Sequence, residues 1–343
     1  MRPARRLAIG LLLAVWLAAP PKAAAEDSVW ARAQEPKRHE RALLLTQVDT
    51  ILHEHLRAST RPSAFRRSIA LHQARRLLEA RGAATSRDVA LRLRLARVMS
   101  ELYDAEGEVG QLENAVLHLT FVAEHARPTT LQAWALGALG VALARLGHHE
   151  QEIAAYDRGI AAEPDPLART TLLANQAEGY MAQGHLAKAI RGYRRALAAT
   201  PGGVMTRGGV TTLWGLAVAL DRAGDLDGAL ESIRAARAFD PHDTLIHGPG
   251  WFYVPAYDED WYMALGHWQS ARDEAFALEG RIASYDLAIA ALQSYVNRAP
   301  ADDRWLPLAS MRLTLCERER TRLRGRRPAA AEQARPALPS PSP

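Results

Sequence analysis

The sequence predicts an all-α protein in which pairs of antiparallel helices stack into a solenoid. Three observations predict this fold class. A large residue is followed four positions later by glycine and seventeen positions further on by proline, and this spacing occurs three times. Apolar residues recur at helical spacing between each glycine and its proline. A small residue holds the same place in each of these segments. The recurring residues are Leu143, Gly147, Gly159 and Pro164; Tyr180, Gly184, Ala196 and Pro201; and Leu220, Gly224, Ala236 and Pro241.

The first 25 residues have the layout of a secretory signal. Three arginines precede the apolar stretch Leu7–Ala19, and the small residues Ala23–Ala25 precede Glu26. Crossing a bilayer as a helix needs about 20 apolar residues, and this stretch is shorter. We therefore expect cleavage between Ala25 and Glu26, and a periplasmic or secreted protein. An uncleaved membrane anchor is the alternative.

The charge of the chain does not indicate a nucleic-acid partner. Without residues 1–25 the chain has 43 − 4 = 39 basic and 38 acidic residues, so it is close to neutral. A local basic run at Glu317–Arg327 is typical of a solvated helix end, and contact with an acidic surface is the alternative. Cys316 is the one cysteine and cannot form an internal disulfide. The fold must therefore depend on a packed core.

Residues 26–127 are predicted to form an N-terminal helical region. Two amphipathic helices, Arg41–Leu56 and Phe65–Gly82, could form a capping pair. A degenerate helix pair follows, in which Gly107 ends the first helix and Leu112–Pro128 holds the second after a longer turn.

Residues 128–241 hold the three matched units. Glycine at the end of each first helix suits a left-handed C-cap, and proline ends each second helix because it cannot continue one. Successive prolines are 37 and 40 residues apart, although the glycine-to-proline distance is constant. The extra residues are therefore expected in the turns Asp165–Ala168 and Gly202–Gly209.

The C-terminal part begins with an aromatic inter-repeat loop at 242–260. A further unit and a capping helix are predicted over 261–325, with Leu265-Gly266 as a landmark, an unusually long first helix and a last helix over 305–324. Asp258 or Asp260 can cap the helix that carries Trp261. The Pro-rich segment 326–343 is expected to be a disordered tail.

The spacing and the residues of the three units resemble the tetratricopeptide repeat, a 34-residue helix-turn-helix unit. The resemblance rests on Leu139-Gly140, Leu143, Gly147, Tyr156, Gly159 and Pro164; on Ala177, Tyr180, Gly184, Ala189, Tyr193, Ala196 and Pro201; and on Leu216-Ala217, Leu220, Gly224, Ala229, Ile233, Ala236 and Pro241.

The resemblance implies a right-handed superhelix with degenerate terminal repeats, whose concave groove is lined by the first helix of each unit and binds a peptide or helix. Chaperone-binding members of this family hold a C-terminal carboxylate with Lys, Arg and Asn in the groove. Only Asn175 could match that set, so this function is not expected. The groove positions would be Trp134, Gly137 and Val141 in the first unit, Thr171, Ala174, Asn175 and Glu178 in the second, and Thr211, Trp214, Val218 and Asp221 in the third.

The segment His247–Tyr262 concentrates aromatic residues in a chain that has few of them. Two roles stay open for it: packing against the third unit, or projecting into the groove and contacting a partner. Exposed rings beside carboxylates would also suit a sugar or another small ligand. The aromatic residues are Trp251, Phe252, Tyr253, Tyr257, Trp261 and Tyr262.

No catalytic constellation is evident in the sequence. It lacks a nucleophile elbow, a phosphate-binding loop and a dinucleotide fingerprint. His53 and His55 point to different sides of a helix, which does not suit a zinc site. Cys316 is expected to be a buried structural residue, and we expect neither a metal nor a cofactor.

The sequence thus favours a non-catalytic scaffold of the bacterial cell envelope that binds a protein partner. A small-ligand or glycan receptor that uses the aromatic loop is the alternative. An enzyme whose site is assembled from distant residues is a third reading.

Overall fold

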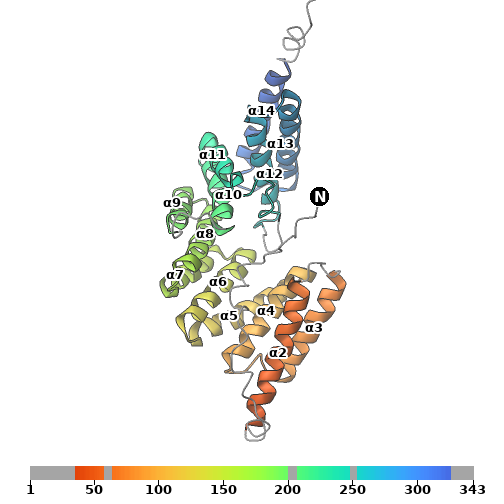
Figure 1. The fold of residues 1–343 in the computed structure, drawn as a ribbon, viewed down its shortest axis with the longest axis vertical. Coiled ribbons are helices and arrows are strands. Elements are labelled where there is room, and N and C mark those ends of the chain that lie inside the picture. Colours follow the sequence, from red (N-terminus) through yellow and green to blue (C-terminus); the bar gives the residue numbers. More distant parts are fainter. Residues whose placement is uncertain (1–34, 58–63, 200–206, 248–252, 326–343) are drawn as a thin grey trace, which may run out of the picture. The chain divides into compact units, whose positions relative to one another are not determined.

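The computed structural model describes residues 35–57, 64–199, 207–247 and 253–325, and the regular structure in these ranges is entirely helical. The helices form two compact units, α2–α9 and α10–α14, and Figure 1 shows the helix pairs within each. The predicted all-α class is confirmed, and consecutive helices pack against each other in pairs. The three repeats predicted over 128–241 are divided between the two compact units. The first two repeats belong to the first compact unit, and the third belongs to the second.

The first unit consists of four consecutive helix pairs. Its core is built from the apolar stripe of each helix, and one cluster joins Leu52 of α2, Leu71 of α3 and Leu95 of α4, all with no exposed surface. Helices with one buried stripe need neighbours on that side, so the stacking follows from the sequence pattern. The helices are α2 (Pro36–Arg57), α3 (Ala64–Ala80), α4 (Val89–Glu106), α5 (Val109–His125), α6 (Thr129–Arg145), α7 (His149–Ala162), α8 (Pro166–Ala182) and α9 (Leu186–Ala198).

The predicted left-handed glycines are confirmed. Gly147, Gly184 and Gly224 have φ of 75°, 80° and 95°. In each case the amide of the next residue donates to the carbonyl of the large residue four positions before the glycine, as in His148 to Leu143 at 2.9 Å. This is the Schellman arrangement, in which the left-handed residue lets the last carbonyls of the helix find donors. The repeated spacing in the sequence therefore encodes one repeated turn.

A close contact between glycine and tyrosine holds the α6–α7 pair together. The Tyr156 side chain of α7 is buried, and it lies so close to Gly140 of α6 that a Cβ there would be 2.5 Å from the ring. Gly159 of α7 also faces α6, since its Cβ would lie 3.3 Å from Cβ of Leu136. Small residues therefore occupy the crossing, as predicted.

Two expected turns are shorter than predicted. Pro166 is the first residue of α8 and Asp165 is its N-cap, where Oδ1 accepts from the amide of Leu167 at 3.0 Å. The extra residues that we assigned to 165–168 thus lengthen the helix, because proline is favourable in the first helical turn. Between Gly107 and α5 only Glu108 intervenes. Another turn was expected at Gly202–Gly209. Residues 202–206 lie outside the described residues, and Arg207–Gly209 belong to α10.

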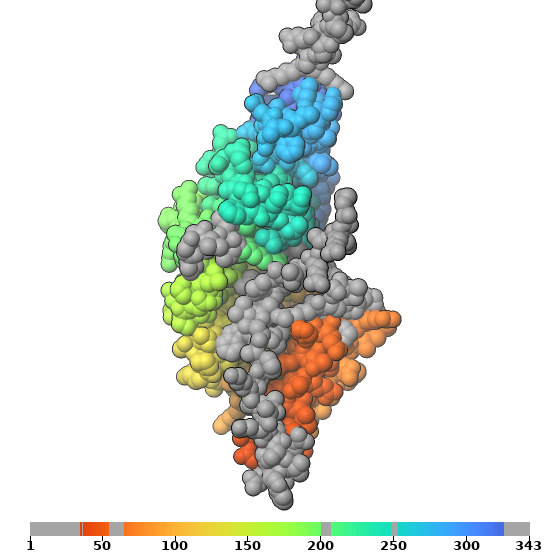
Figure 2. Space-filling view, in the orientation of Figure 1, coloured from red at the N-terminus to blue at the C-terminus, as the bar shows by residue number. Residues whose placement is uncertain are grey.

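In the second unit α10 packs mainly against α11 and also contacts α12, and Arg312 of α14 reaches its end. From Gly209 to Arg222 every residue of α10 is buried except Thr211, which is half-buried. Figure 2 shows the green surface of α10 and α11 meeting the blue surface of the C-terminal helices. The long helix here is α13 and not the first helix α12, contrary to expectation. The helices are α10 (Arg207–Arg222), α11 (Leu226–Arg237), α12 (Asp258–Arg272), α13 (Leu278–Arg298) and α14 (Leu306–Gly325).

Replacing Gly140 tests the packing of α6 on α7. We expect Gly140→Ala to lower the free energy of unfolding by about 1–3 kcal/mol, because the new methyl group overlaps the Tyr156 ring. Gly110→Ala is the control, since a Cβ at this helical and exposed position meets nothing within 4 Å. Urea unfolding followed by circular dichroism measures both. Equal stability of the two variants would contradict the packing argument.

Candidate interaction surfaces

The predicted groove residues of the first two units lie on neighbouring helices. We call this set the α6–α8 face. All its members are half-buried, and α6 contacts α8 directly. The face is nearly uncharged, with Glu178 as its one charged member. It consists of Trp134, Gly137 and Val141 on α6 and Thr171, Ala174, Asn175 and Glu178 on α8.

Two members of this face are also part of the internal packing. The Trp134 ring packs against two core clusters of the first unit. The Asn175 side chain hydrogen-bonds to the buried Tyr156, whose pKa is raised well above its usual value, mainly by burial. These contacts fix the two side chains in place. A partner would therefore meet a surface that is already ordered.

Three of the four predicted groove residues of the third repeat are not on an accessible surface, and the fourth, Thr211, is half-buried. Trp214 is 1% exposed, and Val218 and Asp221 have no exposed surface. Gly266 of α12 packs on Trp214, where a Cβ would lie 3.0 Å from the indole ring. The expectation of an open groove does not hold for these three residues, because the C-terminal helices of the chain cover α10.

A buried ion pair joins α10 to the last helix. The Asp221 carboxylate lies 2.7 Å from the Arg312 guanidinium of α14, and Nε1 of Trp261 in α12 donates to it at 3.0 Å. Burial raises the pKa of Asp221, and Arg312 opposes that shift. Asp221 therefore connects three helices of the second unit.

The next residue, Arg222, forms a second buried pair. It donates to Asp258 of α12 at 2.8 Å, and the two side chains are 2% and 7% exposed. Its guanidinium also lies over the rings of Trp261 and Trp305, at 4.9 and 5.1 Å from their centroids. Burial opposes the charge of Arg222, but the pair with Asp258 raises its pKa overall. This buried charge is therefore compensated from several sides.

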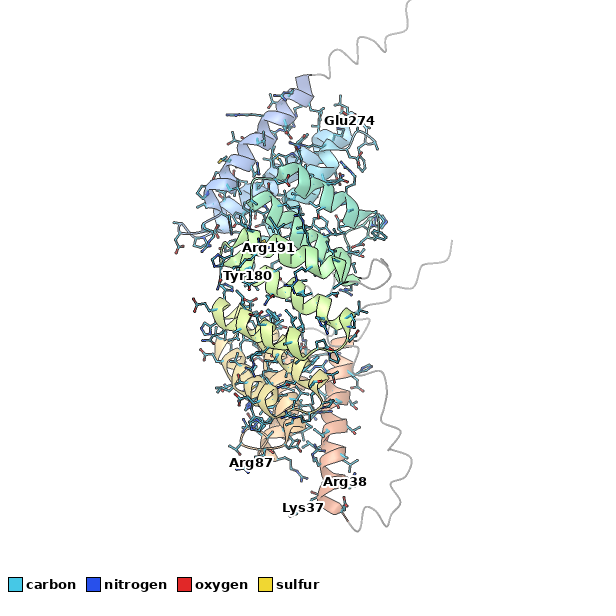
Figure 3. All side chains as sticks on the ribbon, turned by 90° about the vertical axis from the view of Figure 1, so that its left-hand side faces the viewer. Lys37, Arg38, Arg87, Tyr180, Arg191 and Glu274 are labelled. Carbon is cyan, nitrogen blue, oxygen red and sulfur yellow. The ribbon has the colours of Figure 1, made fainter. Side chains whose placement is uncertain are left out.

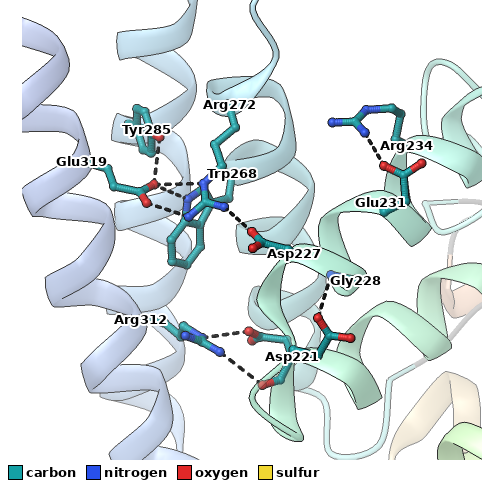
Figure 4. Close-up of polar contacts among 11 residues, drawn as sticks. Asp221, Asp227, Gly228, Glu231, Arg234, Trp268, Arg272, Tyr285, Arg312 and Glu319 are labelled. Atoms are coloured by element: carbon teal, nitrogen blue, oxygen red, sulfur yellow. Dashed lines mark hydrogen bonds and ion pairs between the residues drawn. The ribbon is translucent and has the colours of Figure 1, made fainter.

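Glu319 of α14 is a third polar centre in the second unit (Figure 4). It accepts from Arg272 at 2.6 Å, from Nε1 of Trp268 at 2.8 Å and from the Tyr285 hydroxyl at 2.9 Å. Burial alone would raise the pKa of Glu319, but these three donors together lower it. The carboxylate thus joins α12, α13 and α14. We did not foresee Arg222, Arg312 or Glu319, because their partners are far away in the sequence.

The described aromatics of the 247–262 segment pack against their own unit. Tyr253 stacks edge-on against Tyr262, the Tyr257 hydroxyl donates to Asp303 at 2.8 Å, and Trp261 has no exposed surface. For these residues the structure favours packing over partner contact. Trp251 and Phe252 lie outside the described residues.

The two aspartates expected to cap α12 have other roles. Tyr257 is the N-cap and makes no side-chain capping bond. Asp258 pairs with Arg222, as above, and Asp260 pairs with Arg298 of α13 at 2.7 Å. Both carboxylates form ion pairs with residues far away in the sequence and do not cap α12.

A shallow pocket of about 200 Å³ lies between α11 and α12. Its buried residues are Leu230 and Gln269, and its charged groups are already paired: Asp227 with Arg272 at 2.8 Å, and Glu231 with Arg234 (Figure 4). A ligand would have to break these pairs to gain charged contacts. The pocket therefore has few free polar groups that could recognise a particular ligand.

The described residues give little support to an enzymatic function. Cys316 is buried as predicted, and burial raises the pKa of its thiol, which disfavours the thiolate. Among the described residues, His, Cys, Asp and Glu side chains do not gather in threes with a spacing suited to a metal ion. None of the described helices has both the length and the apolar character that a membrane span requires.

Comparisons with known proteins give distant similarities. No family model matches the chain, and no curated protein does. A solved structure described as that of MamA is 20% identical, with 52% of this chain and 94% of that chain covered and a TM-score of 0.42. The P58(IPK) TPR domain is 13% identical, with 84% and 68% covered and a TM-score of 0.29.

Removing one partner of the Arg222–Asp258 pair should destabilise the second unit. We expect Arg222→Met to lower the free energy of unfolding by about 3–5 kcal/mol, because a buried carboxylate is left without its counter-charge. Replacing both residues, as Arg222→Met with Asp258→Leu, should restore most of that loss. Guanidinium unfolding followed by tryptophan fluorescence measures it. If the single variant is as stable as the double variant, the unpaired Asp258 carboxylate does not carry the expected cost.

Proposed function

We propose that the protein is a non-catalytic scaffold that binds a protein partner through the α6–α8 face. The observation that carries this proposal is the pair of adjacent first helices with ordered, half-buried and nearly uncharged side chains. Repeat folds commonly use the first helices of their units in this way. In the third predicted repeat, the equivalent residues Trp214, Val218 and Asp221 are covered by the chain's own helices. The proposal is therefore confined to the first compact unit.

The chemistry of the face suits a peptide or helix of apolar or mixed character. Trp134 is held by its packing on the core, so ordering it on binding costs little entropy. Val141 and Ala174 add apolar surface, and Thr171 adds a hydroxyl group. A tryptophan at the centre of such a surface is a typical anchor for binding energy. A strongly charged partner would gain little here.

A substitution that changes this face without touching the core tests the proposal. Ala174→Arg places a long cationic side chain on a half-buried helical position, and we expect it to lower recovery of the partner by about tenfold or more. Ala161→Arg, on the exposed side of α7, is the matched control and should leave recovery unchanged. Affinity purification from envelope extract, with quantitative mass spectrometry, gives the comparison. Full recovery with Ala174→Arg would rule this face out.

We also propose that the protein acts in the bacterial cell envelope or outside the cell. The proposal is supported by the arrangement of residues 1–25, which lie outside the described residues: arginines, then an apolar stretch, then small residues before Glu26.

Intact mass spectrometry of the protein from a bacterial host tests this location. We expect a chain that begins at Glu26 and is found in the periplasmic fraction or the medium. A chain that retains residues 1–25 in the membrane fraction would support the anchor instead, and an unprocessed chain in the cytoplasm would contradict export.

A further inference from the structure

The last helix of the first unit, α9, has an exposed surface of unusual composition. Six of its side chains are exposed, and four of these are cations while the other two are alanines. The helix contains no acidic residue. Figure 3 shows Arg191 of α9 and Tyr180 of α8 on the side of the molecule that faces the viewer. We call the four cations, Lys188, Arg191, Arg194 and Arg195, the α9 face.

The cations of the α9 face have no carboxylate partner among the residues that the structure describes. Several exposed arginines elsewhere are paired: Arg38 with Glu35, Arg81 with Glu40 and Arg298 with Asp260, at 2.7 to 3.0 Å. No ion pair or side-chain hydrogen bond involves the four cations of α9 in the described structure. Lys188 instead lies over the Tyr180 ring, 5.2 Å from its centroid. The positive charge of this face is therefore not neutralised internally.

A carboxylate near this face is already engaged elsewhere. Burial and the nearby Asp157 of α7 raise the pKa of Tyr180, and Arg195 opposes that shift. However, Oδ1 of Asp157 accepts a hydrogen bond from Gln176 at 2.7 Å. This bond ties Asp157 to α8, and no ion pair joins it to the α9 cations in the described structure.

The four cations are close enough to repel one another. Arg191 lies three residues from Lys188 and from Arg194, and four from Arg195, so it has like-charged neighbours on the same side of the helix. Like charges at these spacings destabilise a helix. An anionic partner would relieve this repulsion, and arginine can bind a carboxylate through two parallel hydrogen bonds.

We propose that the α9 face is a docking surface for an acidic segment of a partner protein. Its four cations span the eight residues from Lys188 to Arg195. This is about 10 Å along the helix, a length that matches a segment of a few residues with several carboxylates. Complementary charge would also accelerate the encounter. This surface is separate from the α6–α8 face and does not depend on it.

The same observations disfavour other polyanions. Nucleic acid bound without sequence preference usually stacks on exposed aromatic rings, but Tyr193 of α9 is 3% exposed and the Tyr180 ring is covered by Lys188. A membrane-bound helix inserts large apolar side chains beside its cations, and the exposed uncharged residues of α9 are Ala187 and Ala198. An acidic peptide needs neither feature.

Fluorescence anisotropy with a labelled oligoglutamate peptide and the purified full chain tests this proposal. We expect salt-dependent binding at low ionic strength and no binding of an oligoglutamine peptide of the same length. The variant Lys188→Gln, Arg191→Gln, Arg194→Gln and Arg195→Gln should weaken the binding by about tenfold or more. All four positions are exposed, so the variant should keep the circular dichroism spectrum of the unchanged chain.

A matched variant removes the same charge elsewhere. Arg76, Arg87, Arg318 and Arg322 are exposed and make no ion pair in the described structure. Replacing these four with Gln should leave peptide binding within about twofold of the unchanged chain. An equal loss in both variants would overturn the proposal, because net charge would then explain the binding. It would also be overturned if the peptide does not bind, or if an oligothymidine or vesicles with phosphatidylserine bind the α9 face more tightly than the peptide.

Discussion

The second unit depends on two adjacent charges at the end of α10. Asp221 pairs with Arg312 of α14, and Arg222 pairs with Asp258 of α12. A buried charge without a partner is costly, so α10 can stay enclosed only while α12 and α14 are in place. The two pairs connect neighbouring residues of α10 to different helices, α14 and α12. Glu319 adds a third connection between α12, α13 and α14.

The two units use one repeat design for different purposes. In the first unit, the outward side of α6 and α8 stays accessible, with half-buried residues such as Val141 and Ala174. In the second, the corresponding side of α10 is covered by the chain itself, and Val218 has no exposed surface. Equivalent positions of the repeat therefore have different roles. In the first unit they form a candidate binding surface, and in the second unit they are part of the core.

Local signals predicted the fold, and distant pairing limited the prediction of the site. Gly147, Gly184 and Gly224 could be recognised because a left-handed helix end leaves its mark in a few neighbouring residues. The same holds for the crossing at Gly159. By contrast, the partners of Asp221 and Arg222 are 91 and 36 residues away, and no spacing rule connects them. The lengths of turns were also predicted poorly, since Pro166 fits a turn and the start of a helix equally well.

The enclosure of α10 has a consequence for how this chain could change in evolution. Repeat proteins commonly gain or lose whole units by duplication, because each unit contacts only its neighbours. The pairs α6–α7 and α8–α9 retain that freedom, as their turns and crossings are self-contained. The pair α10–α11 does not, because Asp221 and Arg222 are matched to single residues in later helices. A duplicated copy of it would carry two charges with no counterpart, so growth of the array is confined to the units before it.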